Sequence, residues 1–405
     1  MLFQIAWKNI WRNKTRSLLV MGSVVMGLWV GAFMMAYAFG MIDQRLQDAV
    51  KNEISHFQSH HPKFEIDNEV KYFLSEGPEM LRKIRLDKRV KAATGRVIVN
   101  GMVSSANYST GGRFIGIIPA FENEVTGLQD KLTEGAYFDE NSRNKVIIGE
   151  RLAEKLKVKL RSKIVLTFQD STGNILAGAF RIRGLYKTYN ATYDETNIFV
   201  RAMDIDQLIN LPGQYHEIAA LIHDPGKLDT VITDLTVAYP KAKTEDWKDI
   251  APEISLMIES FDQYMIIFLI IILLALSFGI INTMLMAVLE RVREIGVLMA
   301  IGMNRTKLFF MISLETICLV MAATPFGMLL GYFTVQYLGK TGMDLSAIYQ
   351  EGYAAYGVQS YIYPKLEDIY YIRVMCMVIV TALLASIYPA ITAIRLNPIK
   401  AIRKI

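Results

Sequence analysis

The sequence has few of the residues on which disulfide-rich proteins and thiol enzymes depend. Its 405 residues include two cysteines, Cys318 and Cys376, and both lie inside long apolar runs. A disulfide framework is therefore excluded, and a thiol nucleophile in a water-accessible site is not expected. We predict that both cysteines are small residues that face lipid or a neighbouring helix.

Sequence motifs of catalysis and of nucleotide binding are also missing. There is no G-x-S-x-G elbow and no H-E-x-x-H pair. Gly339-Lys340-Thr341 has the ending of a phosphate-binding loop, but Thr334 stands where the first glycine of that loop would be. The segment also follows an apolar run instead of a strand. We therefore predict a chain that is not an enzyme.

Charge is missing from four long stretches, apart from a single glutamate, Glu315, in the third. Each is long enough for the roughly 20 residues that a helix needs to cross a bilayer. The sequence thus predicts a polytopic α-helical membrane protein with four transmembrane helices. These are residues 17–42, 263–289, 308–338 and 374–394. Glu315 could serve a proton relay, but we favour a structural role, hydrogen-bonded to a neighbour or reaching towards water.

The remaining charges predict how the chain crosses the membrane. Lys and Arg are concentrated in residues 1–16, in the 290–305 segment and in the tail, 395–405. The positive-inside rule then places these segments and both termini in the cytoplasm. Residues 1–16 are expected to form an amphipathic elbow helix in the membrane interface. Residues 43–260 and the loop 339–368 would lie outside, and the modest charge of +5 gives no reason to expect nucleic acid as a partner.

Pairs of glycines four residues apart occur in two of the predicted spans. They are Gly27 with Gly31, and Gly327 with Gly331. Small residues at this spacing let two helices approach closely. The neighbouring helix could belong to the same chain or to a second copy.

The segment 43–260 switches between strand and helix periodicity, which predicts a large mixed α+β domain between the first two spans. A polar-faced helical extension is expected at 43–53, and an exposed hairpin tip at Gln169, Asp170, Ser171, Thr172, Gly173 and Asn174. Strand-like runs are 96–99, 113–117, 145–148, 163–168, 179–186 and 218–222. Amphipathic helices are expected at 80–84, 150–156, 204–209 and 228–239.

Three histidines close together in this domain, His56, His60 and His61, raise the question of a metal site. On a strand His56 and His60 would share a face but sit about 13 Å apart, too far for one ion. On a helix they could chelate. Pro62 and the Phe57-Gln58 context favour a strand, so we expect no metal and a surface or packing role.

The segment 290–305 differs from the spans on either side. It carries charges of both signs, and Ile295, Leu298 and Met299 recur at helical spacing on one side. Gly302 offers a C-terminal stop. The sequence predicts a short helix between two spans that faces water, where a soluble partner could bind it.

This segment, E-R-V-R-E-I-G-V-L-M-A-I-G from Glu290 to Gly302, resembles the coupling-helix signature E-R-x-x-E-I-G-x-L-x-A-x-G of MacB/FtsX-type (type VII) ABC transporter permeases. The end of the chain, from Tyr388 to Arg403, is similar to the closing P-A-x-x-A-x-x-x-x-P-x-x-A-L-R of that family. The stretch 146–158 resembles the core of the family's extracytoplasmic domain. Three further stretches, 54–62, 113–119 and 134–138, resemble the lipoprotein-releasing LolC/LolE branch.

The resemblance implies a permease without an ATPase of its own. ATP and magnesium would bind a separate cytoplasmic ATPase subunit, and this chain would bind no cofactor. The implied contacts to the ATPase come from Glu290, Arg293, Glu294, Gly296, Leu298 and Gly302. A second permease chain, identical or different, would complete the transporter in the bacterial inner membrane, in contact with lipids.

For the task of the transporter, the resemblance favours release of lipoproteins to a periplasmic carrier, through mechanical coupling from the cytoplasmic side. The hairpin at 169–174 occupies the place of a carrier-binding hook. Two alternatives remain open: export of a peptide, antibiotic or other amphiphile, and an FtsX-like activator of cell-wall hydrolases that transports nothing.

Overall fold

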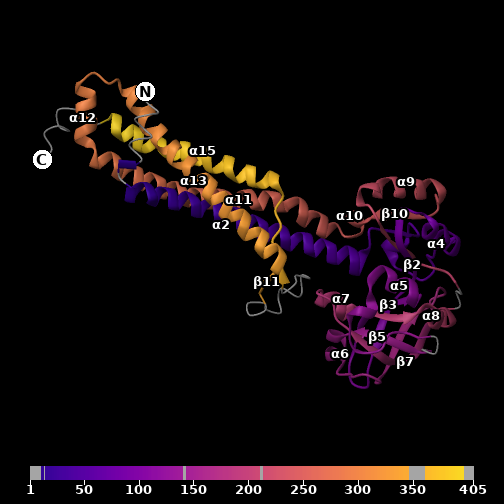
Figure 1. The fold of residues 1–405 in the computed structure, drawn as a ribbon. Coiled ribbons are helices and arrows are strands. Elements are labelled where there is room, and N and C mark those ends of the chain that lie inside the picture. The colour runs from indigo at the N-terminus through magenta and orange to yellow at the C-terminus, as the bar shows by residue number, and fades with distance from the viewer. Residues whose placement is uncertain (1–10, 13, 140–142, 210–212, 346–360, 396–405) are drawn as a thin grey trace. The chain divides into compact units, whose positions relative to one another are not determined.

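The computed structural model describes residues 11–12, 14–139, 143–209, 213–345 and 361–395. These residues form two units (Figure 1). A helical unit comprises the described residues before Asp43 and from Ile258 onward, and an α+β unit comprises those of Asp43–Met257. Most of the predicted elbow, 1–16, and nearly all of the tail lie outside the described residues.

Four helices of the helical unit are long and apolar enough to cross a membrane. They are α2 (Lys14–Ala49), α11 (Pro252–Glu290), α13 (Arg305–Thr341) and α15 (Asp368–Ile394). Each contains one of the predicted apolar runs and continues beyond it, because polar residues at its ends prolong the helix outside the apolar stretch. The protein is therefore a polytopic α-helical membrane protein, with an α+β domain inserted between its first two spans.

The four paired glycines pack helices of this one chain against each other. A Cβ atom at Gly327 would lie 2.9 Å from the Leu28 Cβ atom on α2, and one at Gly331 would lie 3.2 Å from that of Ala32. Gly27 and Gly31 on α2 meet side chains of α11, and Gly31 also meets α15. Nearby, the Trp29 indole N–H donates to the Thr334 hydroxyl at 3.0 Å. Each of the four glycines thus has a neighbouring helix in the same chain.

The two cysteines of the helical unit differ in their exposure. Cys318 is buried in the core of the helical unit, whereas Cys376 is exposed on α15. Leu28, Ile280 and Val378 are other members of that core, each fully buried. Both thiols lie on membrane-spanning helices, as predicted.

The centre of the α+β unit is a closed ring of strands. In ring order they are β2 (Val90–Ser104), β3 (Ser109–Ile117), β8 (Asn197–Arg201), β5 (Lys145–Gly149), β7 (Ile175–Tyr186) and β6 (Lys163–Gln169), and β6 pairs with β2 to close the path. Inside it, side chains such as Phe114, Phe180 and Val200 are buried. The strand predictions that fall in this ring are confirmed. The sequence analysis missed β8, whose run is too short to show a period.

Strand β2 extends beyond the ring into a second layer of the same sheet. There it pairs with β9 (Glu217–Ile222), which continues through β1 (Phe57–His60) to the edge strand β10 (Lys243–Asp246). Helices α4 (Gly77–Leu86) and α9 (Leu228–Ala238) cover this layer with buried side chains that include Met80, Ile84 and Val231. Both helices were predicted, as were α6 (Glu150–Leu156) and α8 (Ala202–Ile209).

Shorter elements complete the α+β unit. The helical extension predicted at 43–53 is present as the end of α2 and a π-helical turn, η1 (Val50–Ile54). The others are α3 (Phe64–Asp67), α5 (Pro119–Thr126), η2 (Leu128–Lys131), β4 (Leu132–Gly135), α7 (Ala191–Thr196), η3 (Pro225–Lys227) and α10 (Trp247–Ile250). In the helical unit, β11 (Met343–Asp344) pairs with β12 (Tyr361–Ile362).

The predicted hairpin joins β6 to β7. Gln169 ends one strand and Ile175 begins the next, and the turn between them is fixed by the carboxylate of Asp170. That carboxylate accepts hydrogen bonds from the backbone N–H groups of Thr172 at 2.8 Å and Asn174 at 2.9 Å. Gly173 takes a φ of 88°, which favours glycine. The residues form an ordered, exposed tip.

Candidate functional site: the short helix between α11 and α13

A sharp bend separates α11 from a short helix, α12 (Val292–Ala300). α11 ends at Glu290, and Arg291, with φ −102° and ψ 19°, leaves the helical conformation for one residue. Asn304 then caps α13, its side chain accepting from the backbone N–H of Thr306. The segment predicted as one helix over 290–305 is thus a nine-residue helix between two turns.

Gly302 ends α12 through a Schellman motif. The N–H of Gly302 donates to the carbonyl of Met299 at 3.1 Å, and the N–H of Met303 donates to that of Leu298 at 3.0 Å. This closure requires a left-handed residue, and Gly302 has a φ of 100°. The predicted stop therefore has a definite backbone cause.

Replacing Gly302 should destabilise this last turn. The loss should be larger for a residue that tolerates a positive φ poorly. We expect Gly302→Val to cost roughly 1–2 kcal/mol of local stability, which is a 5- to 30-fold faster amide exchange. Gly302→Asn should cost less, because asparagine enters the left-handed region more readily. Hydrogen exchange of the peptide that contains Met303 measures the difference. Equal exchange in the two variants would show that the backbone conformation at Gly302 is unimportant.

One side of α12 packs against the helical unit. Val292, Ile295 and Gly296 are buried, and Leu298 and Met299 are partly buried against the same core as the membrane helices. The predicted apolar side of Ile295, Leu298 and Met299 thus faces the protein. Packing of this side fixes which residues point outward.

The outward side of α12 mixes charge with apolar surface. Arg293 and Glu294 are exposed, and Glu290 and Gly302 are exposed at its two ends. Beside them, Val297 is 41% exposed and Ile301 is 79% exposed. These two apolar side chains, four residues apart, follow one another along the helix surface.

The structure divides the six residues predicted to contact an ATPase. Glu290, Arg293, Glu294 and Gly302 are on the surface, whereas Gly296 is buried and Leu298 is partly buried. Gly296 and Leu298 therefore contact the helical unit in this chain, and a role of the six residues in binding an ATPase stays a prediction. Val297 and Ile301, which the sequence analysis did not single out, are exposed beside these residues, and their spacing on the side away from Ile295 could have indicated this.

Two ion pairs fasten the segment to its neighbours. Arg291, in the bend, donates to the Glu315 carboxylate on α13 at 3.2 Å, and both side chains are nearly buried. This contact confirms the structural role expected for Glu315. On the outer side, Arg12 donates to both carboxylate oxygens of Glu294, at 2.7 and 2.6 Å. That pair is about half exposed and so contributes little to stability.

A hollow of about 720 Å³ lies beside α12 within the helical unit. The paired charges of Arg12 with Glu294 and of Arg291 with Glu315 line it, together with apolar side chains such as Met284 and Met311. Helix α12 itself carries no hydroxyl, thiol or imidazole group. Its surface is suited to binding by ion pairs and apolar contact, not to covalent chemistry.

Comparison with known proteins shows what this helical unit is similar to. Residues 266–398 match the family described as "FtsX-like permease C-terminal", a range that contains α12. An uncharacterized ABC transporter permease of Methanocaldococcus jannaschii, MJ1507, is 21% identical over 99% of this chain and 97% of its own. The lipoprotein-releasing system transmembrane protein LolC of Haemophilus influenzae is 23% identical over 69% of this chain and 72% of its own.

LolC of Neisseria meningitidis serogroup B is also 23% identical, over 80% of both chains. Among solved structures, the periplasmic region of MacB from Actinobacillus actinomycetemcomitans aligns with 52% of this chain and 98% of its own, with 13% identity and a TM-score of 0.38. The matched family domain and the three sequence relatives agree with the α12 signature and the four spanning helices. The chain is an ABC transporter permease of the MacB/FtsX type, near LolC.

Proposed function

We propose that α12 is the docking element for a separate cytoplasmic ATPase, and that this chain converts ATP hydrolysis there into work on the other side of the membrane. The observation that carries the proposal is the outward side of α12. Val297 and Ile301 expose apolar surface next to the charges of Arg293 and Glu294, on a helix held between two membrane spans. Apolar anchors flanked by charge are typical of a protein interface.

The proposed assembly has two permease chains and two ATPase subunits, with ATP and magnesium on the ATPase. Both termini and α12 would lie in the cytoplasm, following the Lys and Arg of residues 1–16 and 395–405. This chain would bind no cofactor for the transport reaction. The second permease could be a copy of this chain or a related one.

Motion of α12 would pass along the membrane helices to the α+β unit. Helix α2 continues to Ala49 and α11 begins at Pro252, so each runs past the apolar stretch that crosses the membrane. Such long helices can carry a displacement if two arrangements of the helical unit exist. The spans offer almost no charge to line a polar pore, so the work would be done at or beyond the outer face.

For the cargo we propose lipoproteins leaving the membrane. Support comes from the two LolC relatives, whose names describe a lipoprotein-releasing system, and from the three Lol-like stretches in the α+β unit. The ordered tip at 169–174 would meet a periplasmic carrier. Reconstitution with a radiolabelled lipoprotein tests this part: ATP-dependent release supports it, and export of a free amphiphile instead would contradict it.

The docking proposal is tested by placing a charge on the apolar anchors. The double variant Val297→Asp/Ile301→Asp should lower permease-stimulated ATP hydrolysis at least about tenfold, because two desolvated anchors of an interface are each worth more than 1 kcal/mol. Co-purification of the ATPase with the tagged chain and its turnover in detergent are the measurements. The matched control is Ile175→Asp, at a side chain of the α+β unit that is 73% exposed. An unchanged ATPase in the double variant would refute docking through α12.

The charge pair on the same surface needs a separate design, because Glu294 already binds Arg12. Glu294→Lys removes this internal pair along with any contact to a partner. The swap Arg12→Glu/Glu294→Arg keeps the pair and reverses its direction. If stimulation of the ATPase is lost in both variants, binding of the partner depends on the sign of the charge at residue 294. If the swap restores it, the role of Glu294 is confined to its pairing with Arg12.

A further inference from the structure

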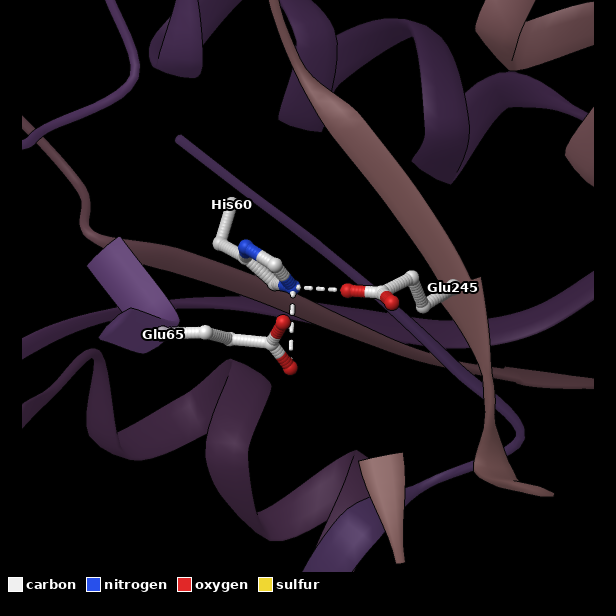
Figure 2. Close-up of side chains that lie close together, drawn as sticks. All are labelled: His60, Glu65 and Glu245. Carbon is white, nitrogen blue, oxygen red and sulfur yellow. Dashed lines mark ion pairs between the residues drawn. The ribbon is translucent and has the colours of Figure 1, made fainter. Parts of the chain in front are cut away.

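A buried histidine in the α+β unit is faced by two carboxylates that the sequence analysis did not connect with it. His60 ends β1, Glu65 lies on α3, and Glu245 lies on the edge strand β10. Figure 2 shows both carboxylates directed at one imidazole nitrogen, Nε2. Its distances are 2.8 Å to Glu245 and 3.7 Å to Glu65.

The strand register explains why these groups converge. β1 and β10 are antiparallel, with His60 opposite Lys243 and Gln58 opposite Glu245. Residues two apart on a strand share a face, so all four side chains lie on the same side of the pair. Glu245 is then the diagonal neighbour of His60, within reach of a long side chain. The turn after β1 brings Glu65 over that face.

The hydrogen bonding of His60 leaves Nε2 facing negative charge. Its other nitrogen, Nδ1, lies 3.2 Å from the His61 carbonyl, which can only accept, so Nδ1 carries a proton. In the neutral ring Nε2 then presents a lone pair to two carboxylates. Nε2 and the Glu245 Oε2 atom lie 2.8 Å apart, and among the described residues neither of these buried atoms has a hydrogen-bond partner besides this mutual contact. A cation bound by both atoms would remove the repulsion.

We propose that His60, Glu65 and Glu245 bind a divalent transition-metal ion of the Zn²⁺ class. Their ligand atoms lie within 4.8 Å of one another, and ligands of tetrahedral zinc are about 3.4 Å apart. One imidazole and two carboxylates are a ligand set that zinc accepts, with water in the remaining position. The His61 carbonyl supplies the second hydrogen bond that orients metal-binding histidines.

Access and space agree with this assignment. The Glu65 side chain is 39% exposed, whereas those of His60 and Glu245 are 4% and 11% exposed. The site therefore opens to water on the side of Glu65. His60 and Glu65 also line a cavity of about 230 Å³, which has room for a water ligand.

Lys243 is the competing cation. Its ammonium contacts both carboxylates, at 3.2 Å from Glu65, and its side chain is 45% exposed. It can therefore swing into water when a metal binds, whereas the buried His60 stays in place. The single positive charge of Lys243 compensates one of the two carboxylates and leaves one negative charge. A divalent ion would compensate the charges of both carboxylates.

The bound ion would tie the edge strand β10 to β1 and α3. In the chain, β1 follows the end of the first membrane helix, and β10 precedes the second. The ion would thus strengthen the pairing of the two strands through which the α+β unit is connected to both spans. As an edge strand, β10 has a hydrogen-bonded neighbour on one side only.

The test uses the full chain in detergent, purified with a histidine-free tag, stripped with a chelator and titrated with ZnCl₂. We expect each chain to bind one zinc ion. The midpoint of thermal unfolding should rise by about 5 °C when the free zinc concentration is about a hundred times Kd. Glu65→Gln, at a half-exposed position that should fold normally, should weaken binding at least about tenfold. Lys243→Met should tighten it by removing the competing cation. Co²⁺ absorption reports the same ligands independently.

The matched control is His223→Gln, which removes an exposed histidine of the same unit. It should leave zinc binding unchanged. The proposal is overturned if the stripped wild type binds no zinc in the titration, or if His223→Gln loses as much binding as Glu65→Gln. It is also overturned if Lys243→Met does not tighten binding, because the cluster is then an ion-pair network around a protonated imidazole.

Discussion

Arg96→Met is expected to destabilise the α+β unit by about 3–5 kcal/mol, because it removes the buried cation that Glu122 and Glu217 share and leaves Glu217 only the more distant, half-exposed Arg113. Arg96 on β2 donates to Glu122 on α5 at 3.0 and 2.8 Å, and to Glu217 on β9 at 2.7 Å. The three side chains are 4%, 0% and 5% exposed. Burial by itself lowers the pKa of the Arg96 guanidinium, but the charges of Glu122 and Glu217 outweigh burial and raise it.

The measurement is urea unfolding of the full chain in detergent, followed by the fluorescence of Trp247 after Trp7, Trp11 and Trp29 are replaced by phenylalanine. Trp247 is the single tryptophan of residues 43–257, so its signal reports on the α+β unit. The free energy of unfolding is obtained by linear extrapolation. A lower midpoint with an unchanged slope would be a loss of stability without a change in the folded surface.

Arg113→Met is the matched control for Arg96→Met. Arg113 also reaches Glu217, at 3.4 Å, but its side chain is 40% exposed, so we expect a loss below about 1 kcal/mol. The triple variant Arg96→Met/Glu122→Gln/Glu217→Gln should recover part of the stability, because it removes the buried charges together. Equal losses for Arg96→Met and Arg113→Met would contradict the assigned role of burial.

Gly327→Leu is expected to separate α13 from α2 and to destabilise the helical unit by more than the 1–3 kcal/mol typical of overpacking. Its Cβ would lie 2.9 Å from the Leu28 Cβ and 3.2 Å from the backbone Cα of Val25. The Cα atom of Val25 belongs to the backbone and cannot move aside by a rotamer change, as a side-chain atom can. The neighbouring hydrogen bond from Trp29 to Thr334 should be lost with the same movement.

Gly22→Leu is the control, since a Cβ at Gly22 meets nothing within 4 Å. Both substitutions replace a helical glycine by leucine, so their effect on helix propensity is the same. The unfolding midpoint in detergent and the elution profile on gel filtration should change for Gly327→Leu alone. Should Gly327→Leu behave like Gly22→Leu, close packing of α2 on α13 is unnecessary for the fold.

Local sequence patterns predicted most elements of this protein. Four long apolar runs, uncharged apart from Glu315, predicted the four membrane helices, and alternation of apolar residues predicted strands such as β6 and β7. These predictions succeeded because burial in a helix or a strand repeats at a fixed period along the chain. Gly302 was recognised for the same reason, since a helix stop depends on one residue and its immediate neighbours.

Residues whose partners lie far along the chain were not predicted. Arg96 lies in a strand-like run and looks like an exposed basic residue, but its partners come from α5 and β9. His60 was weighed against two nearby histidines, whereas the structure gives it Glu65 and Glu245. Neither set has a spacing that a local pattern could show.

By itself, the sequence determined that this is a membrane protein with four spanning helices, an inserted α+β domain and a short helix of the MacB/FtsX type. Only the tertiary structure decided which residues of that helix point outward. Gly296 and Leu298 belong to the signature yet are turned inward, and Val297 and Ile301 take the surface. The reason is that a short helix has no fixed orientation of its own. The core against which Val292 and Ile295 pack sets its rotation.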